Sequence, residues 1–141
     1  MKRLITALLL IPTLALGDGI TIEKPMIPLA PPSALAHAAF MTLTNAGDTP
    51  KVLIGASAER YMMAHIHKSE ETDGVATMSS VDMIEIAPGQ SVMFEHGGLH
   101  IMLMRPQNPM AEGDMVSLTL EFADGTQELV EAMVMPFQHG M

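Results

Sequence analysis

Hydrophobic and polar residues alternate in several short segments of the chain. In residues 115–122 (MVSLTLEF), every second residue from Val116 to Phe122 is apolar and the residues between them are polar. Alternation with a period of two is typical of a β-strand with one buried face. Similar segments predict further strands at residues 38–44, 52–56, 62–68, 83–86, 91–94, 100–104 and 128–135. Little of the remaining sequence has the period of a helix.

Turn-forming residues separate the predicted strands. Thr72-Asp73-Gly74, Ala87-Pro88-Gly89 and Ala123-Asp124-Gly125 each combine residues that favour tight turns. Short strands at this spacing predict one all-β domain, built as an antiparallel sandwich or a Greek-key barrel. The proline-rich residues 24–32 are expected to form an extended entry strand or arm.

The first 17 residues have the pattern of a secretory signal peptide. Residues 1–3 are basic at two positions, residues 4–16 are uncharged and mostly apolar, and Ala15-Leu16-Gly17 offers small residues to a signal peptidase. A buried N-terminal helix is the alternative, which the lack of a polar face disfavours. We therefore expect a signal peptide of residues 1–17, a β domain of residues 18–135 and a short tail of residues 136–141. No later segment approaches the ~20 apolar residues of a membrane span, so we expect an exported protein that is soluble after cleavage.

The composition excludes several kinds of site. The chain has 141 residues with no Cys and 15 Met. Without a thiolate it cannot form a Cys-ligated zinc site, an Fe–S cluster, a disulfide or a blue-copper centre. It has 7 Lys and Arg against 16 Asp and Glu, a net charge of -9. This charge argues against nucleic acid or an anionic membrane as the main partner.

Histidine and methionine side chains share one face of two predicted strands, residues 62–68 and 100–104. We call this surface the His/Met face; it carries Met63, His65 and His67 on the first strand and His100, Met102 and Met104 on the second. The opposite, apolar face carries Met62, Ala64, Ile66, Ile101 and Leu103. Residues two apart on a strand are about 6.6 Å apart and point the same way, so their side chains can converge on one ion.

Each methionine taken singly has a simpler explanation. Methionine is a flexible core residue, and we assign Met83, Met93, Met110 and Met115 mainly to core packing. A single histidine is likewise more often hydrogen-bonded than bound to metal. It is the clustering of both residue types on one face that favours a metal site.

The donor atoms select the metal. Thioether sulfur and neutral imidazole favour Cu(I), whereas zinc prefers thiolate, imidazole or carboxylate, and calcium and magnesium require oxygen. The predicted ion is therefore copper, as Cu(I). Thioethers need no deprotonation, so proton competition comes from the histidines, with reference pKa values near 6.5.

The spacing of four of these residues resembles a known family. Ten residues separate His67 from Met78, 21 separate Met78 from His100, and one separates His100 from Met102. This His-x10-Met-x21-His-x-Met pattern is similar to that of the PCuAC-type periplasmic copper chaperones, the former DUF461 family. Flanking segments that also resemble the family are residues 38–47, 52–57, 84–89, 97–104 and 112–114. The resemblance covers residues 20–135.

The resemblance implies a fold, a site and a function. The fold is a cupredoxin-like β-barrel, and the metal ligands are His67, Met78, His100 and Met102. The implied function is delivery of Cu(I) in the periplasm to the CuA domain of cytochrome c oxidase, together with a Sco-type thiol protein.

The sequence departs from the family pattern at three positions. His65 stands where many members have an acidic residue, Ala76 replaces a frequent Met, and His96 replaces a Pro. His65 and Met104 are auxiliary metal candidates, although surface exposure and core packing explain them equally well.

The tail has two further donors, His139 and Met141, which resemble the His/Met-rich extensions of some members and could hold a second copper as Cu(II). The alternative is a frayed chain end. His37 is expected to be a polar residue at a strand edge.

Two other functions remain alternatives. A copper-sequestering protein for tolerance would use the same ligands and differ only in retaining the metal. A small metalloenzyme could use Glu70 and Glu71 near His67 for a hydrolytic zinc site, but paired acidic residues in a turn are usually solvated. The chain has no His-Glu-x-x-His motif and no evident nucleophile and base pair, so we expect no enzyme activity.

Overall fold

The computed structural model describes residues 19–137, which form ten β-strands. The strands are β1 (Ile20–Pro28), β2 (Ala36–Asn45), β3 (Lys51–Ala58), β4 (Tyr61–Thr72), β5 (Val75–Ser80), β6 (Ile84–Ile86), β7 (Ser91–Phe94), β8 (Leu99–Pro106), β9 (Met115–Phe122) and β10 (Gln127–Met135). The predicted signal peptide and the tail donors His139 and Met141 lie outside the described residues. Within residues 19–137, no helix is long and apolar enough to cross a membrane.

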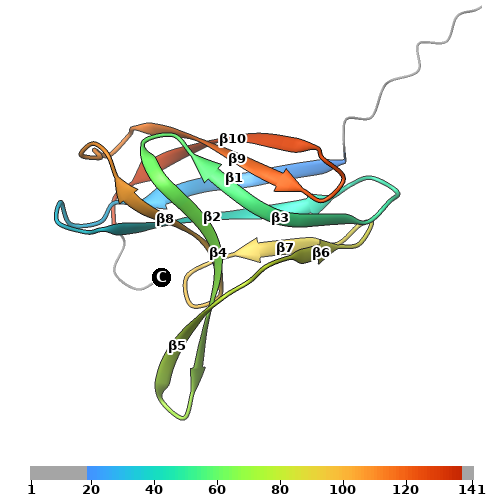
Figure 1. Ribbon diagram of the computed structural model, residues 1–141, viewed down its shortest axis with the longest axis horizontal. Coiled ribbons are helices and arrows are strands. Elements are labelled where there is room, and N and C mark those ends of the chain that lie inside the picture. Colours follow the sequence, from blue (N-terminus) through green and yellow to red (C-terminus); the bar gives the residue numbers. More distant parts are fainter. Residues whose placement is uncertain (1–18, 138–141) are drawn as a thin grey trace, which may run out of the picture.

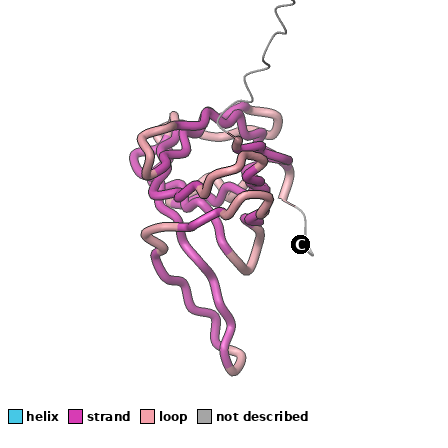
Figure 2. The backbone as a smooth tube through the Cα atoms, turned by 90° about the vertical axis from the view of Figure 1, so that its right-hand side faces the viewer, coloured by secondary structure: helices cyan, strands magenta, loops and turns pink. Residues whose placement is uncertain are grey.

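The ten strands form one continuous sheet in the order β5-β4-β8-β7-β2-β1-β10-β9-β3-β6. Most neighbours are antiparallel, whereas β1 pairs with β10 and β7 with β8 in parallel. The sheet curls over, so that β3 near one end contacts β4 near the other, and two layers enclose the core (Figures 1 and 2). The all-β prediction is confirmed.

Strand β9 shows how the sequence pattern builds the core. Its apolar residues Val116, Leu118, Leu120 and Phe122 are all buried, and the residues between them are at least partly exposed. The other strands contribute buried aliphatic residues in the same way, including Ile66 on β4 and Ile101 and Leu103 on β8. The apolar faces of β4 and β8 therefore point into the core, and their opposite faces point outward.

The β4–β5 hairpin extends away from the body of the protein (Figures 1 and 2). Its turn has positive φ at both central residues, 53° at Asp73 and 77° at Gly74. Two positive φ angles are characteristic of a type I′ turn, which matches the twist of the flanking strands and favours an Asp-Gly sequence. All six residues of β5 are exposed. This strand was not predicted, because it has no buried face and hence no apolar alternation.

Several methionines are not in the core, contrary to the prediction. Met83, Met93 and Met115 are exposed over 48% to 65% of their surface, whereas Met110 does pack against the core. Met62, which was expected on the apolar face of its strand, is 60% exposed. Alternation explains Met93, which lies between buried Val92 and Phe94 and pairs with Thr42 on the outer side of the sheet. Methionine was assigned by its hydrophobicity rather than by the face on which it falls.

Candidate metal centre

The His/Met face is formed by two adjacent antiparallel strands, β4 and β8. The register places its residues in three cross-strand pairs, which are His67 with His100, His65 with Met102 and Met63 with Met104. All three pairs lie on the outer side, because the residues between them, such as Ile66 and Ile101, are buried in the core. On the far side of β8, the neighbours of Met102 and Met104 are the small residues Ala38 and Ala36.

His100 has the most constrained side chain of the face. It is only 5% exposed, and its Nδ1 lies 3.2 Å from the carbonyl oxygen of Gly98. A carbonyl can only accept, so Nδ1 carries the hydrogen, and in the neutral imidazole Nε2 then presents a lone pair. This Nε2 is buried and has no hydrogen-bond partner. A buried nitrogen with a lone pair and no partner needs an explanation, and metal ligation supplies one, because ligating histidines usually bond the other ring nitrogen in this way.

His67 and Met78 meet beside His100. The Nδ1 atom of His67 lies 3.3 Å from the sulfur of Met78, and the rings of His67 and His100 are 5.9 Å apart between centroids. Strand β5 brings Met78 into this position, because Met78 pairs with Ser69, two residues after His67 on β4. The hairpin therefore supplies the third donor.

The electrostatic environment of His67 favours its neutral form. Burial lowers the pKa of His67 below 6.5, and the nearby His100 and His65 lower it further. A neutral imidazole is the form that binds metal. His67 is thus available as a ligand at neutral pH.

Met102 lies one cross-strand pair away from the other three predicted ligands. It is half-buried on the same face, two residues after His100 and opposite His65. The backbone separation is about 6.6 Å, a distance that the flexible side chain of methionine can span. The structure therefore brings His67, Met78 and His100 together and places Met102 within reach.

The auxiliary candidates occupy the rest of the face. The ring of His65 stacks on that of His67, with centroids 6.3 Å apart and an interplanar angle of 14°. Met104 is half-buried and pairs with Met63. The sequence places Met63 on the His/Met face but does not single it out as a ligand. The alternation of β4 alone could have indicated Met63.

Acidic residues take little part in the face. The Glu70 carboxylate forms an ion pair with Lys68 at 2.6 Å, and both residues lie on the side of β4 opposite His67. The described residues contain no group of three or more His, Cys, Asp or Glu side chains that could hold a metal ion. The donors gathered here are imidazole and thioether groups.

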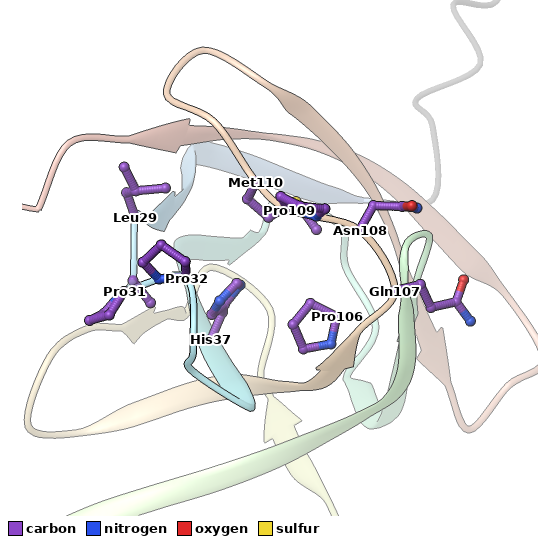
Figure 3. A pocket seen from close by; sticks show the side chains of 10 residues that line it. Leu29, Pro31, Pro32, His37, Pro106, Gln107, Asn108, Pro109 and Met110 are labelled. Atoms are coloured by element: carbon purple, nitrogen blue, oxygen red, sulfur yellow. The ribbon is translucent and has the colours of Figure 1, made fainter.

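His37 lies on the inner side of β2, away from the His/Met face. Its Nδ1 is 2.7 Å from the hydroxyl of Tyr61, and it is buried rather than at an exposed strand edge. Burial lowers the pKa of His37 and raises that of Tyr61 to about 12. His37 also borders a cavity of about 330 Å³ between the β1–β2 and β8–β9 loops, whose other walls include Leu29, Pro32, Pro106 and Met110 (Figure 3).

Known proteins resemble this chain in sequence and structure. The LpqE-like family model ("Putative lipoprotein LpqE-like") matches residues 20–134. A protein of Leifsonia xyli subsp. xyli named "Putative lipoprotein Lxx21020" is 29% identical over 122 residues, which are 86% of this chain and 72% of the relative.

Solved structures resemble it as well. The solution structure of CuI-DR1885 from Deinococcus radiodurans is 31% identical, with a TM-score of 0.66, over 81% of this chain and 76% of that one. The copper-bound PCuAC domain from PmoF2 has a TM-score of 0.68 over 84% of this chain and 93% of that domain. Its 21% identity supports the fold alone.

The TM-scores of 0.66 and 0.68 show that this chain shares the fold of those structures. The predicted cupredoxin-like fold and the resemblance to PCuAC-type proteins are confirmed. This chain belongs to the LpqE-like family and has the fold of the PCuAC domains.

Proposed function

We propose that this protein is a periplasmic copper chaperone that holds Cu(I) through His67, Met78, His100 and Met102. One observation carries the proposal: His100 Nε2 is buried without a hydrogen-bond partner, beside the contact of His67 with Met78. Leaving such a nitrogen unpaired costs about 1–3 kcal/mol, which a bound metal would offset. The solved relative named for copper at 31% identity, CuI-DR1885, supports the choice of ion.

The donor set suits Cu(I) better than other ions. Two thioethers and two neutral imidazoles add no charge, and soft sulfur favours a monovalent soft ion over zinc or calcium. The four donors come from three adjacent strands, β5, β4 and β8. Only His100 is buried, while Met78 is 54% exposed. An acceptor can therefore reach one side of the site.

Delivery is the second part of the proposal. The acceptor is the CuA domain of cytochrome c oxidase, with a Sco-type thiol protein as a further partner, and the signal peptide of residues 1–17 directs the protein to the periplasm. Sequestration of copper for tolerance is the alternative. The proposal includes no enzyme activity and no Cu(II) site at His139 and Met141.

Anaerobic titration with Cu(I) against a chromophoric chelator tests the site. We expect His100→Ala and Met102→Leu to weaken the binding of the first equivalent, His100→Ala by at least about 100-fold, because changes even in the outer shell of a metal cost 10–100-fold. Met93→Leu is the matched control, since Met93 is an exposed methionine outside the His/Met face. Unchanged affinity in both ligand variants would reject the site.

Transfer distinguishes delivery from sequestration. The loaded protein is mixed with an isolated, copper-free CuA domain, and the visible spectrum of the acceptor is recorded after an oxidant is added, because Cu(I) itself has no visible absorption. Delivery predicts that the acceptor fills faster than copper dissociates into a chelator alone. If the acceptor fills from free Cu(I) but not from the loaded protein, the protein is a store.

A further inference from the structure

The His/Met face is longer than one copper site requires. The His67–His100 and His65–Met102 pairs are followed by a third pair of soft donors, Met63 with Met104. The third pair lies four residues from the first along each strand, which is about 13 Å. An ion held at this end of the face would be separate from an ion held between His67 and His100.

The third pair is only partly buried. Met63 is 40% exposed, Met104 is half-buried, and the neighbour of Met104 on β2 is Ala36, which is too small to cover the sulfur. A long apolar side chain left in water forgoes the stabilisation that burial would give it. Core packing therefore does not account for Met63, and it accounts for Met104 only in part.

His65 completes a set of three donors at this end. Side chains directly opposite each other on antiparallel strands have Cβ atoms about 4.5–5.5 Å apart, and diagonal neighbours are about 7–8 Å apart. Met63 and Met104 are directly opposite, and His65 is diagonal to Met104 and two residues from Met63. The two flexible thioether side chains can close these distances onto one ion.

We propose that Met63, His65 and Met104 form a second Cu(I) site on the His/Met face. This inference rests on the proposed function, because it assigns the same cargo to both ends of the face. The second site has two thioethers and one exposed imidazole, and it lacks a buried histidine such as His100. It therefore binds Cu(I) more weakly than the first site and fills second.

The number of Cu(I) equivalents bound by the whole chain tests the proposal. We expect two equivalents for the wild type under anaerobic conditions, with the second binding at least about tenfold more weakly. The double variant Met63→Leu/Met104→Leu should bind one equivalent with the wild-type affinity of the first site. The control variant Met62→Leu, which changes an adjacent exposed methionine outside the three pairs, should still bind two equivalents of Cu(I).

Methyl NMR identifies which methionines respond to each equivalent. The methyl signals of Met78 and Met102 should shift with the first equivalent, and those of Met63 and Met104 with the second. Thermal unfolding of each apo variant verifies that the fold is intact.

The outcomes separate this inference from the proposed function. One equivalent in the wild type, or two in the double variant, would overturn the second site and leave the first intact. No tight binding in the wild type would instead reject the proposed function. A second equivalent that shifts methyl groups elsewhere would also overturn the inference.

Discussion

The turn of the β4–β5 hairpin offers a way to disturb the proposed metal site without changing any of its donors. Gly74 has a φ of +77°, and a Cβ added to it would meet no atom within 4 Å. A Gly74→Ala change therefore introduces backbone strain and no steric contact. Because β5 carries Met78, the change acts on the position of one donor through the hairpin alone.

The magnitude follows from the backbone. A left-handed conformation costs an L-residue about 1–2 kcal/mol, which lowers the ratio of formed to open hairpin by about 5- to 30-fold. All residues of β5 are exposed, so its opening exposes no core, and an isolated two-stranded hairpin is marginally stable. Apparent affinity scales with the fraction of the competent conformation, so we expect Cu(I) binding to weaken by about 2- to 10-fold.

The assay combines Cu(I) competition titration with amide hydrogen exchange and urea unfolding. Exchange in β5 should accelerate in Gly74→Ala, while the free energy of unfolding changes by less than about 0.5 kcal/mol. Gly125→Ala is the matched control, because Gly125 has a φ of +85° and equally open space, but its turn joins β9 and β10 in the body. The control should lose about 1–2 kcal/mol of global stability and keep its Cu(I) affinity.

Two results would refute the reasoning. Wild-type affinity in Gly74→Ala, together with faster exchange in β5, would show that Met78 does not contribute to binding. Unchanged exchange in β5 would show that the strain at residue 74 is relieved elsewhere.

Three further predictions concern the stability of the body. Asn45 is fully buried and donates to two backbone carbonyls, so Asn45→Leu should lower the free energy of unfolding in urea by about 2–4 kcal/mol, and a loss below 1 kcal/mol would contradict this. Burial lowers the pKa of His37 and raises that of Tyr61 to about 12. The free energy of unfolding should therefore fall as pH drops below 6.5 and as pH rises above 10. Tyr61→Phe should remove the loss of stability at alkaline pH. Hydrogen bonds from Lys51 and Thr126 hold the pKa of Asp124 well below 3.8. The ionised carboxylate therefore contributes to the free energy of unfolding above pH 3.8, and this contribution is lost as pH falls further. The stability of Asp124→Asn should depend less steeply on pH in this acidic range.

The alternation of side chains was sufficient to predict much of the fold. Strands β7 and β9 have the predicted bounds, residues 91–94 and 115–122, because both alternate between buried and exposed positions. The same local rule placed the histidines of β4 and β8 on the outer face, since the intervening residues are strongly apolar. Which residue of β4 faces which residue of β8 was not predictable from alternation, because register depends on the pairing of distant segments.

Features that depend on tertiary contacts escaped prediction. Strand β5 is defined by its pairing with β4 rather than by any pattern of its own, so Met78 was found by spacing and not by structure. The carbonyl of Gly98, which fixes the tautomer of His100, belongs to a turn whose sequence gives no sign of that contact. The alternation of β7 indicates that Met93 is exposed, whereas the general preference of methionine for the core led to the opposite prediction.

The proposed donors differ greatly in their accessibility. His100 is held by the carbonyl of Gly98 and buried, whereas Met78 lies on a strand in which every residue is exposed. A ligand from an acceptor approaches through solvent, so it meets Met78 before it can reach His100. A site enclosed on all sides would retain its ion, and one open on all sides would lose it to any chelator. The gradient of burial from His100 to Met78 is therefore the property of this structure that best suits a protein that holds Cu(I) and then releases it to a partner.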